Sequence, residues 1–203
     1  MSDLQTTIHL VNRAKAGENG ALNLLMERYL QRILRIVRAR LGPQLRTKVE
    51  SMDVVQEVMI RAVKAFDNFE PKDEAAFLHW ISKLVQNEIC DLADYHGAQK
   101  RNLHQEIQSK QDSEKDRSIL SNIPADSLYR PSFQLRLKED VLALEAAMDN
   151  LSQVQKEIVI MRQYEGLSFK EIGTELNLSE DAARMQFARA INKLTDFMTQ
   201  TNE

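Results

Sequence analysis

The sequence of 203 residues has one cysteine, six glycines and four prolines. A single cysteine excludes an internal disulfide, and the neighbours of Cys90 (Leu84, Val85 and Ile89) indicate a core position rather than a reactive thiol. No stretch is long and apolar enough to span a membrane, and the polar N-terminus does not resemble a secretory signal, so we expect a cytoplasmic protein without membrane insertion. Few glycines and prolines, with abundant Leu, Ala, Gln, Glu, Lys and Arg, predict an all-α fold.

Catalytic motifs are also missing from the sequence. It contains no glycine-rich phosphate loop and no nucleophile motif. The residues that come closest to a metal site are His79, Glu88, Asp91 and His96. A metal site inside a helical bundle needs Glu-x-x-His pairs on two helices, and these pairs are absent. We therefore expect no enzymatic activity, no metal and no cofactor.

The C-terminal part contains two helix starts separated by a sharp turn. Ser168 and Glu171 have the spacing of a capping box, in which a side-chain oxygen and a carboxylate satisfy free amides at the start of a helix. Asn177, which tolerates a left-handed backbone, stands where the chain must turn. Ser179 is the N-cap candidate of a second, amphipathic helix over 181–194. This order predicts a helix-turn-helix.

The second of these helices has two different faces. Its apolar stripe consists of Ala183, Phe187, Ala190, Ile191 and Leu194. Its outward side carries Asp181, Met185, Ala188, Arg189 and Asn192, flanked by Arg184 and Gln186. A helix held by its apolar stripe, with small, amide and Arg side chains outward, suits the major groove of DNA. An ordinary surface helix is the alternative, but two capped helices joined by a tight turn favour DNA binding.

No surplus of positive charge accompanies this motif. The chain has a net charge of −3, and residues 136–203 carry eight basic and twelve acidic groups. Because neutralisation of phosphates supplies most of the non-specific affinity for DNA, such a domain binds DNA weakly by itself. We therefore expect a partner that helps to hold it on DNA.

Four helices are predicted before this motif. Their approximate extents are Leu4–Val11, Leu22–Val37, Asp53–Phe66 and Pro71–His96. Asp53 is the N-cap candidate of the third, and Gly97 is expected to stop the fourth. Together they predict a helical domain over residues 1–97.

A polar segment follows this first domain. Residues 98–131 are low in aromatics and contain two prolines, which is typical of a flexible linker. Helices are predicted again over 132–149 and 152–164, the second of them under a Ser152/Gln155 cap. With the helix-turn-helix they form a small domain over 132–203. The predicted architecture is thus all-α, with two small helical domains joined by a linker.

Two stretches of the sequence resemble a known family. In the C-terminal part, the run EGLSFKEI at 165–172 is followed by Ser179, Arg189-Ala190 and Leu194. In the N-terminal part, DVVQEVM at 53–59 and FLHWI at 77–81 are followed by Asn87 and Asp91. In this order, on either side of a polar linker, these motifs resemble bacterial RNA polymerase sigma factors of the extracytoplasmic-function (ECF) type over nearly the whole chain. The resemblance implies a sigma factor that binds core RNA polymerase and directs promoter-specific transcription initiation.

The resemblance also implies a role for each of three residue sets. Core polymerase would be bound by Asp53, Gln56, Glu57 and Arg61. The melted downstream (minus-ten) promoter element would be bound by Phe69, Lys72, His79, Lys83, Asn87 and Asp91. The upstream (minus-thirty-five) element would be bound by Ser168, Lys170, Ser179, Ala183, Arg184, Met185, Gln186 and Arg189, although Ala183 also belongs to the apolar stripe. A further partner that the family often uses is an anti-sigma factor.

Alternatives remain open for several of these residues. Asp53 would also suit a simple N-cap, and Gln56 and Glu57 a solvated face, although polymerase binding is favoured. Trp80 at helical spacing from Phe77 is assigned to the core rather than to a base pocket. Two departures from the family pattern, Ala182 and Gln186 in the recognition helix, put the sequence preference in doubt. A third is that no Arg-rich segment follows Asp91 directly.

One predicted helix of the N-terminal part carries a basic face. Arg28, Arg32 and Arg35 share one helical face, which would follow a DNA backbone, meet an acidic partner surface or simply be solvated.

The rival function is a helix-turn-helix regulator with a helical N-terminal sensing or interaction domain. Such a regulator binds its operator without polymerase, usually as a symmetric dimer.

Overall fold

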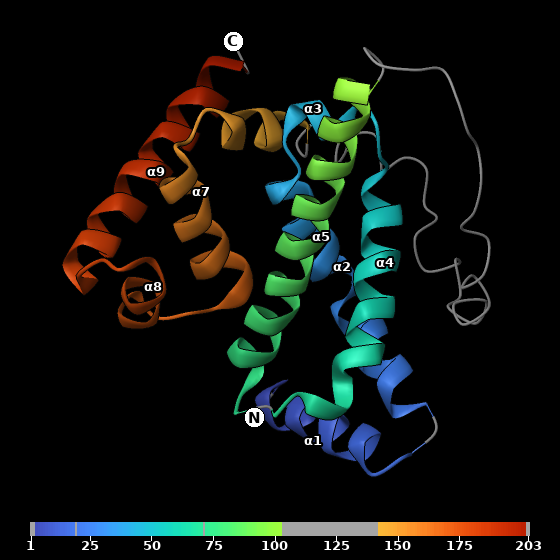
Figure 1. Ribbon diagram of the computed structural model, residues 1–203. Helices are drawn as coiled ribbons and strands as arrows, with labels where there is room; N and C mark the ends of the chain where they lie inside the picture. Colours follow the sequence, from blue (N-terminus) through green and yellow to red (C-terminus); the bar gives the residue numbers. More distant parts are fainter. Residues whose placement is uncertain (1–2, 19, 71, 103–141, 202–203) are drawn as a thin grey trace, which may run out of the picture.

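The computed structural model describes residues 3–18, 20–70, 72–102 and 142–201, and every regular element in these ranges is helical (Figure 1). The N-terminal unit, as we name residues 3–102, contains α1 (Asp3–Lys15), α2 (Ala21–Arg40), α3 (Pro43–Arg46), α4 (Ser51–Ala65), the short 3₁₀ helix η1 (Phe66–Asn68) and α5 (Glu74–Asn102). The C-terminal unit, residues 142–201, contains a helix over 142–149, α7 (Gln153–Ile160), the π-helical turn η3 (Met161–Glu165), α8 (Phe169–Leu176) and α9 (Glu180–Thr201). The predicted all-α fold is confirmed.

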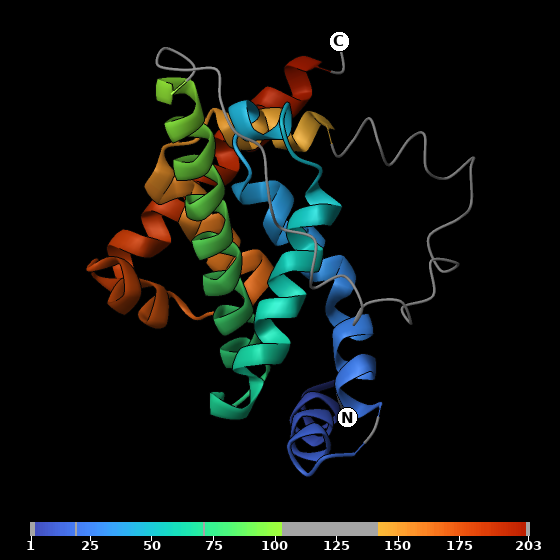
Figure 2. The same ribbon diagram turned by 45° about the vertical axis from the view of Figure 1, so that its right-hand side comes forward.

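The N-terminal unit is a bundle in which α2, α4 and α5 run side by side and α1 crosses at one end (Figures 1 and 2). Each of the three long helices buries one apolar stripe; Ile33 and Ile36 of α2, Val55 and Val58 of α4, and Phe77 and Ile81 of α5 are fully buried. Burial of this apolar surface is the main force that holds the helices together. Trp80, expected in the core, is partly buried against it. Cys90 was also expected in the core, but it is exposed on α5, so that prediction is wrong.

Three details of this bundle differ from the sequence prediction. The predicted N-cap Asp53 lies in the first turn of α4, because the helix begins at Ser51 with Glu50 as its extended N-cap residue. The fourth helix does not stop at Gly97 but continues to Asn102, since one glycine inside a helix costs only about 1 kcal/mol. The short helix α3 was not predicted; Pro43 occupies its first turn, where a missing N–H does no harm.

The C-terminal unit lies against one side of the N-terminal unit, alongside α2 and α5 (Figures 1 and 2). The predicted helix 132–149 is described only from residue 142, and the predicted linker after residue 102 lies outside the described residues. Ser152 and Gln155 form the expected capping box at the start of α7. No helix of the described ranges combines the length and apolarity needed to cross a membrane.

The two units share one apolar core. Met148, Val159 and Leu194 of the C-terminal unit belong to the same buried cluster as the three helices of the N-terminal bundle. A second, smaller cluster lies wholly in the C-terminal unit apart from a contact with Ala75, and it contains Ile172 of α8. The first cluster fixes how the units sit on each other, and the second holds the helix-turn-helix together.

Candidate nucleic-acid interface

The segment α8–turn–α9 has the local geometry that the sequence predicts for a helix-turn-helix. The Ser168 hydroxyl accepts a hydrogen bond from the Glu171 amide (3.3 Å), and the Glu171 carboxylate accepts one from the Ser168 amide (2.7 Å). The Ser168 hydroxyl also donates to the Glu171 carboxylate (2.6 Å), and this bond, together with the one from the Ser168 amide, holds the pKa of Glu171 below its ordinary value. Asn177 adopts the left-handed conformation at the turn (φ 55°, ψ 43°), and Ser179 caps α9 by accepting from the Ala182 amide (3.1 Å). The capping box, the left-handed turn and the Ser179 cap are thus confirmed.

A glycine that the sequence analysis did not single out sets the spacing of these two helices. A Cβ atom placed on Gly173 would lie 2.7 Å from the carbonyl oxygen of Leu178 in the turn. Real Cβ atoms do not approach backbone oxygen so closely, and the backbone cannot move aside cheaply. Gly173 therefore allows α8 to contact the start of α9 directly.

The outward face of α9 presents a cationic and apolar surface to solvent. Arg184, Met185 and Arg189 are exposed, and Lys170 is exposed at the start of α8. Arg184 is paired with Glu180 of the preceding turn (2.8 Å), which holds its guanidinium over the helix N-terminus. This group of side chains is available to a ligand from solution.

The guanidinium of Arg184 lies over an aromatic ring. The guanidinium carbon of Arg184 lies 5.6 Å from the centroid of the Phe169 ring, and that of Arg162 lies 4.8 Å from it. Arg162 also donates to the carbonyl of Leu167 (2.8 Å). Such cation–π contacts orient a cation on the surface. The sequence analysis missed both Arg162 and Phe169 as parts of this surface, although Phe169 lies inside the run that carries the family resemblance.

Other predicted contacts with the upstream element have structural roles in this geometry. Ala183 is fully buried in the core beneath α9, so the prediction that it contacts DNA is inconsistent with its position. Its apolar-stripe assignment explains its burial. Gln186 is half-buried, and its amide oxygen accepts from Gln155 (3.3 Å). Ser168 and Ser179 are exposed but use their hydroxyls as caps.

The predicted polymerase-binding residues form one face of α4. Asp53, Gln56 and Glu57 are exposed at spacings of three and four residues, so they share a side of the helix. Arg61, one turn further, reaches across to α5 and pairs with Glu88 (2.6 Å) and Asp91 (2.9 Å). The face is thus polar and open to solvent along its first two turns.

Glu88 is the buried member of this ionic contact. Only 7% of its side chain is exposed, compared with 62% for Asp91. Burial raises the pKa of Glu88, and the nearby Arg61 opposes that rise. Arg61 therefore has a structural task between α4 and α5 in addition to the predicted contact with polymerase.

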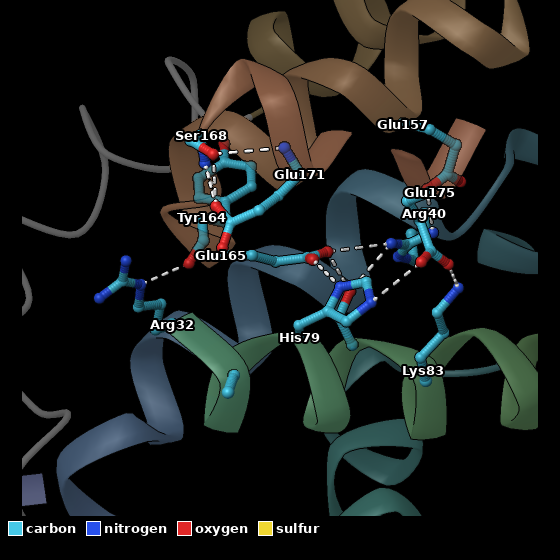
Figure 3. A network of polar contacts seen from close by, with 12 residues as sticks. Arg32, Arg40, His79, Lys83, Glu157, Tyr164, Glu165, Ser168, Glu171 and Glu175 are labelled. Atoms are coloured by element: carbon cyan, nitrogen blue, oxygen red, sulfur yellow. Dashed lines mark hydrogen bonds and ion pairs between the residues drawn. The ribbon is translucent and has the colours of Figure 1, made fainter. Parts of the chain in front are cut away.

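The predicted downstream-element residues fall into two groups. Lys72, Asn87 and Asp91 are exposed on the N-terminal unit. Phe69 is mostly buried, stacked on Trp80 with ring centroids 4.5 Å apart. His79 and Lys83, one turn apart on α5, point toward the C-terminal unit and are bonded to it (Figure 3).

The centre of the contact between the two units is a buried carboxylate, Glu165 (Figure 3). It is fully buried at the end of η3, where it accepts from the Ser82 hydroxyl (2.5 Å) and from the Arg40 guanidinium (3.2 Å). The Nδ1 atom of His79 lies 2.6 Å from its other oxygen. Arg40, whose side chain is 6% exposed, also bonds Glu157 of α7. One carboxylate of the C-terminal unit is thus held by two helices of the N-terminal unit.

Further ionic contacts surround this centre. Lys83 of α5 is hydrogen-bonded to Glu175 of α8, and its cation lowers the pKa of Glu175. Arg46 of α3 pairs with Asp149 (2.6 Å). Burial by itself would raise the pKa of Asp149, but hydrogen bonds from Arg46 and Lys156 outweigh it and hold that pKa below its ordinary value.

The basic run of α2 has a defined neighbour in this structure. Arg38 bonds Glu145, and the Nε of Arg32 donates to the carbonyl of Tyr164 (2.5 Å). Of the three settings considered for the run, Arg32 therefore meets the C-terminal unit of the same chain. Arg28 and Arg35 are exposed. The excess of acidic groups in residues 136–203 is the sequence property that matches this surface.

Among the described residues, no three side chains of His, Cys, Asp or Glu gather in the way that a metal ion needs.

The family and the relatives agree with this geometry. The family model described as ECF sigma factor matches residues 4–199. The RNA polymerase sigma factor NccH of Alcaligenes xylosoxydans xylosoxydans is 25% identical to this chain over 195 residues, which cover 96% of both chains. The ECF RNA polymerase sigma-E factor of Escherichia coli K12 is 27% identical over 191 residues, which cover 94% of this chain and 93% of the relative. A solved structure of CnrH in complex with the cytosolic domain of CnrY has the same fold, with a TM-score of 0.55 and 20% identity over 96% of this chain and 98% of the other. The match over nearly all of its length shows that this chain belongs to the ECF sigma factor family.

Proposed function

We propose that this sigma factor divides promoter recognition between its two units, with α9 on the upstream element, the α5 side of the N-terminal unit on the melted downstream element and the outer face of α4 on core polymerase. The observation that carries the proposal is the capped α8–turn–α9 segment, whose outer face leaves Arg184, Met185 and Arg189 in solvent. A helix presented in this way can enter the major groove and read base edges.

The contacts with the upstream element follow from exposure and charge. Arg184 and Arg189 would bond base edges or phosphates, Met185 would contact apolar groups in the groove, and Lys170 would neutralise a phosphate. The caps Ser168 and Ser179 stand at the N-termini of α8 and α9, and helix N-termini favour phosphate.

The contacts with the downstream element need an unstacked strand. Asn87, exposed on α5, carries an amide that suits base edges, and Lys72, His79 and Lys83 would supply cationic or hydrogen-bonding contacts. Phe69, stacked on Trp80, would support the pocket rather than stack on a base. This role is non-catalytic, and it places the protein in the cytoplasm, where polymerase and promoters are found.

The charge balance supports the dependence on polymerase. The C-terminal segment is net acidic, so its own affinity for DNA is low, and a large partner that holds both units on DNA supplies what is missing. An anti-sigma factor that competes with polymerase is a further proposed partner.

The test is run-off transcription with core polymerase on a genomic fragment library. The variant Arg184→Ala/Arg189→Ala should lose promoter-directed transcription and still co-purify with core polymerase, whereas Lys48→Ala, which removes an exposed charge elsewhere, should keep both activities. Loss of both activities in the double variant would contradict the division of labour. Tight binding of the purified chain to a palindromic site, without any affinity for polymerase, would favour the rival regulator.

A further inference from the structure

The contact between the two units covers part of the surface assigned above to DNA. His79 and Lys83 lie on the same face of α5, one turn apart, and both meet carboxylates of the C-terminal unit (Figure 3). Glu165 takes the Nδ1 side of His79, and Glu175 lies 3.7 Å from its Nε2 while it bonds Lys83. Two neighbouring DNA-binding candidates are therefore occupied by two negative groups of the same chain.

From this arrangement we propose that the C-terminal unit inhibits the N-terminal unit by placing Glu165 and Glu175 where phosphates of the promoter strand would bind. A carboxylate and a phosphate oxygen accept the same charge-assisted hydrogen bonds from His and Lys. The inference rests on the proposed function, because it takes His79 and Lys83 as part of the downstream-element surface. It goes beyond that function by giving the free chain a self-inhibited state.

Complementary charges on the two units support a contact that is specific and that can still open. Along α2 and α3, Arg38, Arg40 and Arg46 each pair with an acidic residue of the C-terminal unit. These charged pairs lie around the apolar core that the two units share. Charged contacts give an interface specificity and electrostatic steering, and in an open form both sides of each pair can be solvated or bound by another partner.

The self-inhibited state depends most on the contacts of Glu165, because this carboxylate is buried between the two units. Its side chain is completely buried, and all of the partners described for it, Arg40, His79 and Ser82, belong to the N-terminal unit. A charge at this depth is tolerated only with such partners. When the units separate, Glu165 returns to solvent, where water replaces these partners.

The same geometry leaves other surfaces free. Asp53, Gln56 and Glu57 of α4 are exposed in the closed state, as are Arg184 and Arg189 of α9. The proposed polymerase face is therefore accessible before the units separate. Polymerase can bind the closed form first and then separate the units, which uncovers His79 and Lys83 only where a promoter is to be opened.

The experiment measures the separation of the units and DNA binding independently. The one native thiol, Cys90, is exposed on α5, and a second is introduced by Thr199→Cys on α9, so that two spin labels report the distance between the units. The probe for DNA binding is a short fluorescein-labelled single strand of mixed sequence at low salt. Neither readout requires polymerase, so failure of the inference is distinguishable from failure of the proposed function, which is tested by co-purification and transcription.

The main variant is Glu165→Gln/Glu175→Gln, and the matched control is Glu27→Gln/Asp196→Asn. Both variants remove two negative charges, but the control removes them from exposed positions on α2 and α9. We expect the main variant to raise the fraction of separated units by about tenfold or more, because it removes the buried charge of Glu165 and the charged partner of Lys83. Apparent affinity for the strand should rise in proportion to the open fraction while the closed form dominates. The control should show no change in distance and only the small gain in affinity that its charge produces.

A charge exchange keeps the inference falsifiable if the double variant is poorly folded. Glu175→Lys alone should open the units, and Lys83→Glu/Glu175→Lys should close them again, as read by the label distance. Unchanged distances in the main variant and in Glu175→Lys would overturn the inference. Separation of the labels without tighter strand binding would also overturn it, because the contact would then not mask DNA binding.

Discussion

Two neighbouring helices of the N-terminal unit carry polar side chains that differ in their surroundings. On α4, Asp53, Gln56 and Glu57 face solvent, whereas on α5, His79 and Lys83 are bonded to the C-terminal unit. The sequences of the two helices do not reveal this difference, since both show the same amphipathic pattern. The difference arises because only α5 lies beside the acidic partner surface. A polar face available to other molecules is therefore defined by what packs beside it as well as by its own residues.

The largest effect is expected from removing the cation that both buried carboxylates share. Arg40→Met leaves Glu157 and Glu165 buried without their guanidinium, which costs about 3 to 5 kcal/mol when one partner of a buried pair is lost. Because the chain can avoid this cost by separating its units, we expect amide hydrogen exchange of α5 to become as fast near His79 as that of the outer face of α4. Unchanged exchange in α5 would mean that Arg40 is not required for closure.

A smaller effect is expected between α4 and α5 themselves. Arg61→Ala leaves Glu88 buried without its cation, at a cost of about 1 to 3 kcal/mol in the free energy of unfolding measured with denaturant. Adding Glu88→Gln should recover most of this loss, because the neutral amide does not need the cation. If the double variant is no more stable than Arg61→Ala alone, the contact with Glu88 is not the source of the loss.

Acid should weaken the contact between α5 and the C-terminal unit and should leave the exposed face of α4 unchanged. The pKa values of Glu175 and Asp149 are lowered in the closed state by contacts with Lys83, Arg46 and Lys156. Groups with lowered pKa values stabilise the closed state fully above their ordinary pKa of about 4, and this contribution is lost as the pH falls through the lowered values. Label distances recorded from neutral to acid pH should therefore lengthen only below about pH 4. Lengthening that begins near neutrality would contradict the role of Glu175 and Asp149.

The smallest effect on stability is expected on the exposed face of α4. Glu57→Ala should change the free energy of unfolding by less than about 0.5 kcal/mol, as exposed substitutions usually do. Its affinity for core polymerase, measured by competition with the unchanged protein, should nevertheless fall. Equal affinity of the two proteins would remove Glu57 from the proposed polymerase contact.

Local features of the fold were predictable because they depend on residues a few positions apart. The caps at Ser152, Ser168 and Ser179 and the turn at Asn177 are each determined by a side chain and the amides next to it. Boundaries that depend on competition between weak preferences were less predictable. Gly97 lies within α5 because its small helix penalty is outweighed by the rest of a long helix.

The contact between the units was not predictable from the same patterns. Arg40 and Glu165 are 125 positions apart, and each alone resembles an ordinary exposed charge. The charge excess of residues 136–203 indicated a partner that helps DNA binding, and an acidic partner surface was one alternative for the basic run of α2, but neither indicated that the two meet each other. Only the packed structure, which buries Glu165 completely, makes this pairing visible.

The π-helical turn η3 has a consequence for how this arrangement can change between related proteins. A π-helical turn holds one residue more than an α-helical turn, and such turns often arise where a residue has been inserted into a helix. Deletion of one residue between Met161 and Glu165 would rotate the following carboxylate by about 100° around the helix axis, away from Arg40. We therefore expect that a relative with one residue fewer at this place lacks the contact between this carboxylate and Arg40.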